Sequence, residues 1–102
     1  MNALTSSQIL AILETKLSHW QYLPTPNVIR REIRCKNFYE TMAIVNAVAW
    51  IAHQHNHHPD LEVGYNYCHI NYATHDAKGV TTKDIDCAQA INQLIDTNAH
   101  TC

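Results

Sequence analysis

Apolar residues near the start of the chain recur at the spacing of a helix. The stretch begins with Thr5 and Gln8, which fit a capping box because the hydroxyl can accept from an early backbone N–H while the amide reaches back. Pro24 and Pro26 follow, and each disfavours helix in the residue before it. We therefore predict a helix that ends before these prolines and buries one face: Ile9, Leu13 and Leu17.

Three later segments alternate with period two, as strands do when one face is buried. From Val28 to Cys35, apolar Ile29, Ile33 and Cys35 alternate with Arg30, Glu32 and Arg34. A second strand is predicted at 61–63, and the clearest one runs over 67–74. A short additional strand is predicted at 20–23.

Two further helices are predicted, each with a polar cap at its start. Asn37 and Glu40 fit a second capping box. The helix after it, 38–56, must stop by His58 because Pro59 follows, and its wide apolar stripe predicts that it is the most buried helix: Phe38, Met42, Ile44, Val45, Val48, Ala49, Ile51 and Ala52. Thr81 and Asp84 cap the last helix, whose predicted buried stripe is Ile85, Ala88, Ile91 and Ile95.

These elements, with the strand at 20–23, give the order α-β-β-α-β-β-α. Short strands joined as hairpins with helices on one face make an α+β sandwich. The 102 residues, of which 46% are hydrophobic, fit one domain spanning 1–102. The net charge of −2 argues against direct binding of nucleic acid. With no apolar run near the ~20 residues of a membrane span and no signal-peptide pattern, we expect a soluble cytoplasmic protein.

The numbers and spacing of the cysteines and glycines argue against two classes of binding site. The four cysteines form no C-x-x-C pair, so we expect reduced thiols, with Cys68 and Cys87 acting as small core side chains: Cys35, Cys68, Cys87 and Cys102. With two glycines, the chain has no Gly-rich phosphate loop.

Histidine is the unusual residue, with four of the eight lying between positions 53 and 58. His53 and His57 have the i, i+4 spacing of two metal ligands on one helix face, although no third ligand stands in a recognised motif. The same cluster could transfer protons at neutral pH. A third interpretation is a solvated helix end, where histidine suits the helix dipole.

His75 lies at the end of the clearest strand, a common place for functional side chains. If the strands at 61–63 and 67–74 form a hairpin, His57, His58 and His75 lie at one end of the sheet and can line one pocket. Taken alone, His75 is equally explained as a polar residue leaving a strand.

The second half of the chain combines these motifs: Asn-His-His-Pro-Asp at 56–60, Val63, Tyr-Asn at 65–66, Thr-His-Asp at 74–76, Gly-Val-Thr at 79–81 and Asp84. Together they carry a resemblance to the pterin-4a-carbinolamine dehydratases. It extends upstream to Trp20, Arg31, Phe38 and Val48-Ala49, and covers about Trp20 to Ile95.

The resemblance implies a four-stranded antiparallel sheet with helices on one face. It also implies loss of water from 4a-hydroxytetrahydropterin to give quinonoid dihydropterin, without metal or cofactor. By position, His57 and His75 would be the acid–base pair and His58 would position the pterin. The ring would be held by Pro59 and the 74–77 segment, with Trp20 as a possible apolar wall; the segment's residues in this role are Thr74, Asp76 and Ala77.

One departure from the family pattern leaves a second function open. His53 stands where the family usually has a glutamate. A carboxylate at that position could orient a neighbouring imidazole and raise its pKa, whereas a second imidazole cannot do so when it is protonated. The alternative is a non-catalytic dimeric binding or assembly factor on the same fold. The family associates as dimers or tetramers, and the strand 67–74, without Lys or Pro, would form the dimer if it lay at a sheet edge. The helix 38–56 would then make a tetramer.

Overall fold

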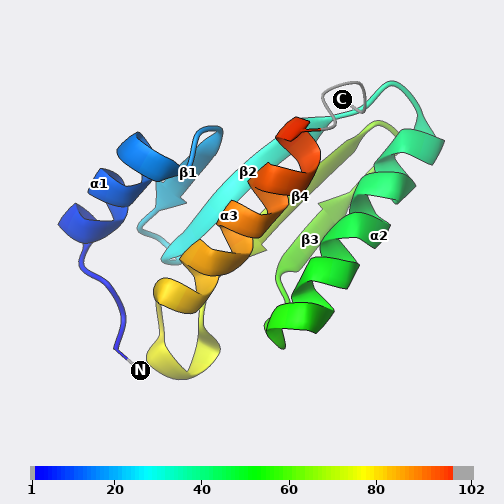
Figure 1. The fold of residues 1–102 in the computed structure, drawn as a ribbon. Coiled ribbons are helices and arrows are strands. Elements are labelled where there is room, and N and C mark those ends of the chain that lie inside the picture. The colour runs from blue at the N-terminus through cyan, green and yellow to red at the C-terminus, as the bar shows by residue number, and fades with distance from the viewer. Residues whose placement is uncertain (1, 98–102) are drawn as a thin grey trace.

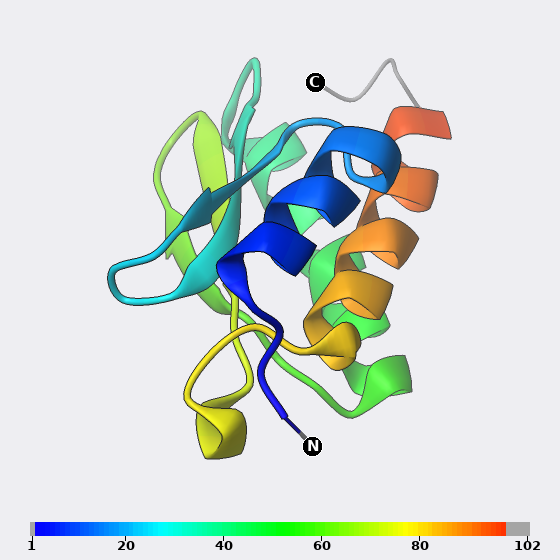
Figure 2. The same ribbon diagram turned by 90° about the vertical axis from the view of Figure 1, so that its left-hand side faces the viewer.

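The computed structural model, which describes residues 2–97, has one sheet with all three α-helices on the same face (Figures 1 and 2). Figure 1 shows α3 lying between α1 and α2, and Figure 2 shows the other face of the sheet without a helix. The predicted order α-β-β-α-β-β-α is confirmed, with one added 3-10 turn: α1 (Ser6–Lys16), β1 (Trp20–Leu23), β2 (Val28–Arg34), α2 (Phe38–His55), β3 (Asp60–Val63), β4 (Tyr67–Tyr72), η1 (His75–Ala77) and α3 (Thr82–Thr97).

The four strands are antiparallel and lie in the order β1-β2-β4-β3. The condition under which the strand 67–74 would form the dimer, a position at the sheet edge, is therefore not met, because β4 pairs with β2 on one side and β3 on the other. A strand with both sides paired needs no Lys or Pro to protect it. The actual edges, β1 and β3, are four residues long each, and short edges are less prone to pairing.

The helix caps follow the sequence closely, with one difference. Thr5 and Gln8 form both hydrogen bonds of a capping box. The Asn37 side chain accepts from the Glu40 N–H at 2.9 Å, but the Glu40 carboxylate accepts from the N–H of Lys36 instead of completing the box. The start of α2 is thus capped by one of the two predicted bonds.

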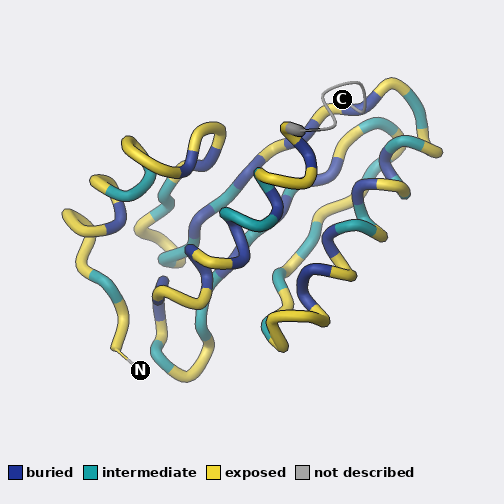
Figure 3. Tube along the Cα trace, viewed as in Figure 1, coloured by how far each residue is buried: buried dark blue, intermediate teal, exposed yellow. Residues whose placement is uncertain are grey.

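The buried face of α2 is rotated from the predicted stripe. Thr41, Ile44, Val48, Ile51 and Ala52 are buried, whereas Phe38 is 45% exposed. Figure 3 shows α2 buried along the side toward the sheet and α3, and exposed along its outer side. The outer side carries Tyr39 and Trp50, with exposed fractions of 84% and 60%. The prediction that this is the most buried helix is wrong, because α3 occupies the middle position.

Cysteines contribute to the core as small apolar groups. Cys68 and Cys87 are fully buried thiols, and burial raises the pKa of the Cys68 thiol to about 11. Burial also raises the pKa of the Cys87 thiol. Both therefore stay protonated and unreactive near neutral pH. Cys102 lies outside the described residues, so its expected thiol state stays a prediction.

A polar cluster attaches the first hairpin to α3. Trp20 is buried, and its indole N–H donates to the Asn92 side-chain oxygen at 2.7 Å. Arg31 donates to the same oxygen at 2.6 Å and to Asp96 at 2.9 Å. Asn92 also donates to the carbonyl of Ser18. These hydrogen bonds satisfy the Trp20 indole and both terminal nitrogens of Arg31, whose burial would otherwise be costly, and leave the Arg31 Nε without a partner among the described residues.

Arg30 joins three strands on the sheet face that no helix covers. Its guanidinium donates to Glu32 on its own strand, to Glu62 on β3, and to Asn71 and His69 on β4. The hydrogen bond from Arg30 lowers the pKa of the Glu62 carboxyl.

Among residues 2–97, no helix is long and apolar enough to cross a membrane.

Candidate active site

The end of α2 directs the paired histidines out of the helix. Asn56 adopts the left-handed conformation, with φ 49° and ψ 44°, a role in which asparagine is tolerated. The Asn56 N–H donates to the carbonyl of His53, and the His57 N–H donates to that of Ala52 at 3.0 Å. This pair of bonds is a Schellman motif, which ends the helix and fixes the backbone of His57.

A buried carboxylate at the start of α3 binds His57. Asp84 is 0% exposed, and its Oδ1 lies 2.5 Å from Nε2 of His57. Its Oδ2 accepts from the Thr74 hydroxyl and from the Thr81 N–H, both at 2.8 Å. A carboxylate can only accept, so the Nε2 of His57 must carry a proton, and in the neutral ring Nδ1 is the free proton acceptor.

The two threonine hydroxyls form an ordered chain toward Asp84. Their oxygens lie 2.6 Å apart. Thr74 gives its proton to Asp84, so Thr81 must donate to Thr74. The Thr81 oxygen also accepts from the Lys83 N–H, as a helix cap does. Every oxygen of this buried group therefore has a hydrogen-bond partner.

A tight loop presents His75 beyond the end of β4. Thr74 and Gly79 close the loop with backbone hydrogen bonds in both directions. A Cβ at Gly79 would lie 2.9 Å from the Asn27 side chain, so no larger residue fits without a shift. Within the loop, His75 begins the turn η1 and is exposed.

Two cavities meet at His58. One, of about 500 Å³, is bordered by His58 and His75. The other, of about 390 Å³, is bordered by His57 and His58. Both volumes lie in the range of small-molecule sites. The full linings are Val28, His58, Asp60, Asn71, Ala73 and His75 for the first, and Val48, Ala49, Ala52, His53, Asn56, His57, His58, Pro59 and Leu61 for the second.

The structure brings some of the predicted site residues together and separates others. Pro59 borders the cavity of His57, and Thr74 acts through Asp84. Asp76 and Ala77 lie in η1 and border neither cavity. Trp20 borders neither one either, because its ring lies in the core with its N–H bound to Asn92.

Sequence reasoning missed three residues near this site. Asp84 was part of the matched motif, but the only role predicted for it was to cap α3; it does so, and its second oxygen binds His57. His57 thus has a carboxylate partner although His53 replaces the family's usual glutamate. Asp60 and Asn71 border the cavity of His75. Asp60 ends the matched motif at 56–60, whereas the only signal for Asn71 was the alternation of its strand.

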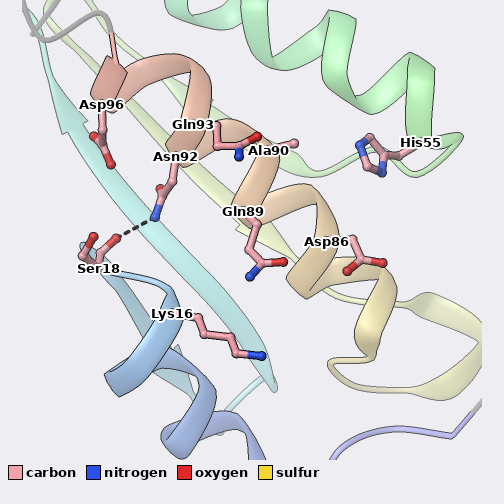
Figure 4. Close-up of a pocket in the computed structure, with 9 residues that line it drawn as sticks. All are labelled: Lys16, Ser18, His55, Asp86, Gln89, Ala90, Asn92, Gln93 and Asp96. Atoms are coloured by element: carbon pink, nitrogen blue, oxygen red, sulfur yellow. Dashed lines mark hydrogen bonds between the residues drawn. The ribbon is translucent and has the colours of Figure 1, made fainter.

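A larger cavity lies elsewhere. It has a volume of about 810 Å³ and follows the outer side of α3 (Figure 4). Lys16 reaches it from α1 and His55 from α2, while Asp86, Gln89 and Asn92 come from α3. None of the predicted site residues borders it.

Metal binding by the histidine cluster finds no geometric support in the described part of the chain. There, no three His, Cys, Asp or Glu side chains come together as metal ligands would. The expected absence of a metal stays a prediction.

Comparison with known proteins decides the family. The family model described as pterin 4 alpha carbinolamine dehydratase matches residues 2–94. The chain belongs to this family. A protein of Legionella pneumophila (strain Lens), provisionally named a pterin-4-alpha-carbinolamine dehydratase, is 50% identical over 91% of this chain and 82% of its own. A relative from Nitrosospira multiformis with the same provisional name is 46% identical over 87% of this chain and 77% of its own.

Solved structures agree with the fold. A transcriptional coactivator/pterin dehydratase from Brucella melitensis matches with a TM-score of 0.84 and 31% identity, covering 91% of this chain and 98% of that one. A pterin dehydratase-like protein identified as a RuBisCO assembly factor in the alpha-carboxysome matches with a TM-score of 0.62. Its identity is 17%, over 74% of this chain and 87% of that one, so it shares the fold. The predicted four-stranded sheet with helices on one face is confirmed.

Replacing Asp84 by asparagine tests how His57 is held. The carbonyl oxygen of the introduced amide can keep the bonds from Thr74 and Thr81, which turns its NH₂ group toward His57. We expect neutral His57 to change from the Nε2–H to the Nδ1–H tautomer, as seen in the ¹⁵N chemical shifts of its ring. Loss of the charged acceptor should lower the free energy of unfolding by about 1.5–3 kcal/mol.

The matched control for this prediction is Asp86→Asn, an exposed aspartate two residues along the same helix. It should leave the His57 tautomer unchanged and the free energy of unfolding within about 0.5 kcal/mol. An unchanged tautomer in Asp84→Asn would contradict the assigned hydrogen bond.

Proposed function

We propose that the protein dehydrates 4a-hydroxytetrahydropterin to quinonoid dihydropterin, with His57, His58 and His75 as its catalytic residues. The observation that carries this proposal is the position of His58, which borders one cavity with His57 and another with His75. Family membership supplies the substrate class. The reaction would recycle the pterin after aromatic amino-acid hydroxylation.

The reaction requires two proton transfers of opposite direction. The C4a–O bond breaks, and the departing hydroxyl takes a proton to leave as water. N5 loses its proton, and the electron pair left behind forms the C4a=N5 double bond. Imidazoles, with an ordinary pKa of ~6.5, can serve as both donor and acceptor at one pH.

His57 and His75 are proposed as the acid–base pair. Because Nε2 of His57 is occupied by Asp84, proton transfer would take place at Nδ1. His75 is exposed on η1, where a bound substrate can reach it. A pterin lying across His58 would extend into both cavities, so His58 would position the ring between the pair, with Pro59 beside it.

Alanine variants of the pair test these roles. His57→Ala and His75→Ala should each lower kcat for chemically generated 4a-hydroxytetrahydropterin by roughly 10²–10³-fold, the usual contribution of a general acid or base. His58→Ala should mainly raise KM. His55→Ala is the control, because His55 is exposed at the end of α2 and borders neither cavity. Wild-type turnover by either of the first two variants would remove that residue from the mechanism.

Removal of metal ions tests the competing use of the histidines. We expect the untagged protein to contain no stoichiometric zinc and to keep its full turnover in chelator, because His53 and His57 have no third ligand in a motif. Elemental analysis and an assay with and without chelator measure this. About one zinc per chain, together with activity lost in chelator, would favour the metal site.

A second candidate function, a binding or assembly factor, is favoured by the outer side of α2. Tyr39 and Trp50 are exposed there, and Val63 and Tyr65 are exposed at and just beyond the β3 edge, with fractions of 43% and 66%. Where such side chains form a contiguous patch, they mark a protein contact. Turnover separates the two functions, because a factor without catalytic activity would not accelerate the dehydration.

We also expect the protein to associate with itself. The β1 and β3 edges are short, but in the described residues each has a partner strand on one side only, so two copies could still join their sheets about a two-fold axis. Packing of α2 on its own copy would give a tetramer. Sedimentation at low micromolar concentration should give at least about twice the chain mass of 11.6 kDa. A mass equal to one chain would contradict this expectation.

A further inference from the structure

The buried Tyr72 contacts the proposed catalytic His57 at two points. Its ring stacks on the imidazole, with centroids 5.3 Å apart and planes inclined by 27°. Its hydroxyl donates to the backbone carbonyl of His57 at 3.0 Å. Tyr72 itself is 0% exposed, at the last position of β4. One side chain therefore holds both the ring and the main chain of the same histidine.

The other contacts of His57 complete a rigid setting. Its N–H donates to the carbonyl of Ala52, and its carbonyl also lies 3.9 Å from the Cys87 thiol. Nε2 donates to Asp84. These hydrogen bonds do not fix the tilt of the imidazole ring. Tyr72 restricts that tilt, because its own ring stacks on the face of the imidazole.

Tyr72 also connects His57 to the segment that carries His75. Two residues further along the chain, Thr74 donates to Asp84, and His75 comes directly after it. His57 follows α2, whereas His75 follows β4. The end of β4 thus sets the position of one member of the proposed acid–base pair relative to the other.

Packing alone does not require a tyrosine at this position. Phenylalanine or leucine could fill a core site without a buried hydroxyl, which is costly unless it is hydrogen-bonded. Here the hydroxyl donates to the His57 carbonyl, which lies outside its own strand. Burial raises the pKa of the Tyr72 phenol far above its usual range, so it remains a donor and transfers no proton itself.

We infer that Tyr72 is a positioning residue for the dehydration, orienting the imidazole of His57 so that Nε2 faces Asp84 and Nδ1 faces the substrate. This inference rests on the proposed function, because it assigns Tyr72 a part in that reaction. Tyr72 touches neither cavity and acts through His57.

Two substitutions separate the hydroxyl from the ring. Tyr72→Phe keeps the stacked ring and should lower kcat about 3- to 10-fold, as expected for one hydrogen bond. Tyr72→Leu removes both contacts and should lower kcat by about 100-fold, the scale of a catalytic group displaced by about 1 Å. In both variants KM should stay within about 3-fold, because Tyr72 does not touch the substrate. If Tyr72→Leu fails to fold, Tyr72→Phe decides the question.

A control and a second measurement distinguish positioning from general loss of stability. Ile70→Val changes a fully buried residue two positions earlier on β4, and should leave kcat within about 2-fold. The ring ¹⁵N signals of His57 report orientation without any substrate. In wild type they should show the Nε2–H tautomer, and in Tyr72→Leu a mixture of tautomers.

The outcomes are distinct. Wild-type kcat and His57 signals in both Tyr72 variants would overturn the inference, as would an equal loss of kcat in Ile70→Val. If the wild-type protein itself does not turn over the pterin, the proposed function fails. The tautomer measurement still decides in that case whether Tyr72 orients His57.

Discussion

The buried carboxylate of Asp84 is the group on which the rest of the site depends. A charge with no exposure to solvent is tolerated only when its hydrogen bonds are complete. Its partners come from three separate parts of the chain: His57 after α2, Thr74 after β4, and Thr81 before α3. Removing one partner would leave the buried carboxylate with an unsatisfied hydrogen-bond acceptor, so the three segments are held together as one unit.

Local sequence patterns predicted the helices and strands, whereas contacts between distant residues determine which side chains form the site. The alternation in β2 and the capping box of α1 involve neighbouring residues, so the sequence shows them directly. By contrast, Trp20 is bonded to a residue 72 positions away, and His57 to one 27 positions away. The hydrophobic periodicity of a helix or strand cannot indicate hydrogen bonds between residues so far apart in the sequence. The family resemblance implied Trp20 as an apolar wall and included Asp84 in its motif, but neither the resemblance nor the periodicity indicated these hydrogen-bond partners.

The order of the strands in the sheet likewise depends on both local and long-range contacts. The β3–β4 hairpin could be predicted because its strands are adjacent in the sequence, but pairing of β2 with β4 spans the whole of α2. The alternating, uncharged segment 67–74 has two opposite explanations, an unprotected edge or an internal strand. The pattern of side chains is identical in both, and only the second partner strand decides between them.

The groups proposed for catalysis and those suited to association occupy different parts of the same elements. His57 and His58 follow the C-terminal end of α2, whereas Tyr39 and Trp50 lie along its outer side. The proposed catalysis would depend on where the helix ends, which the left-handed Asn56 and the backbone hydrogen bonds of His57 determine. The proposed packing of α2 on a partner would depend on its outer side, where Tyr39 and Trp50 take no part in those backbone hydrogen bonds. A chain of this fold can therefore lose or keep either property without rebuilding the other, because a change on the outer side of α2 leaves its C-terminal bonds in place.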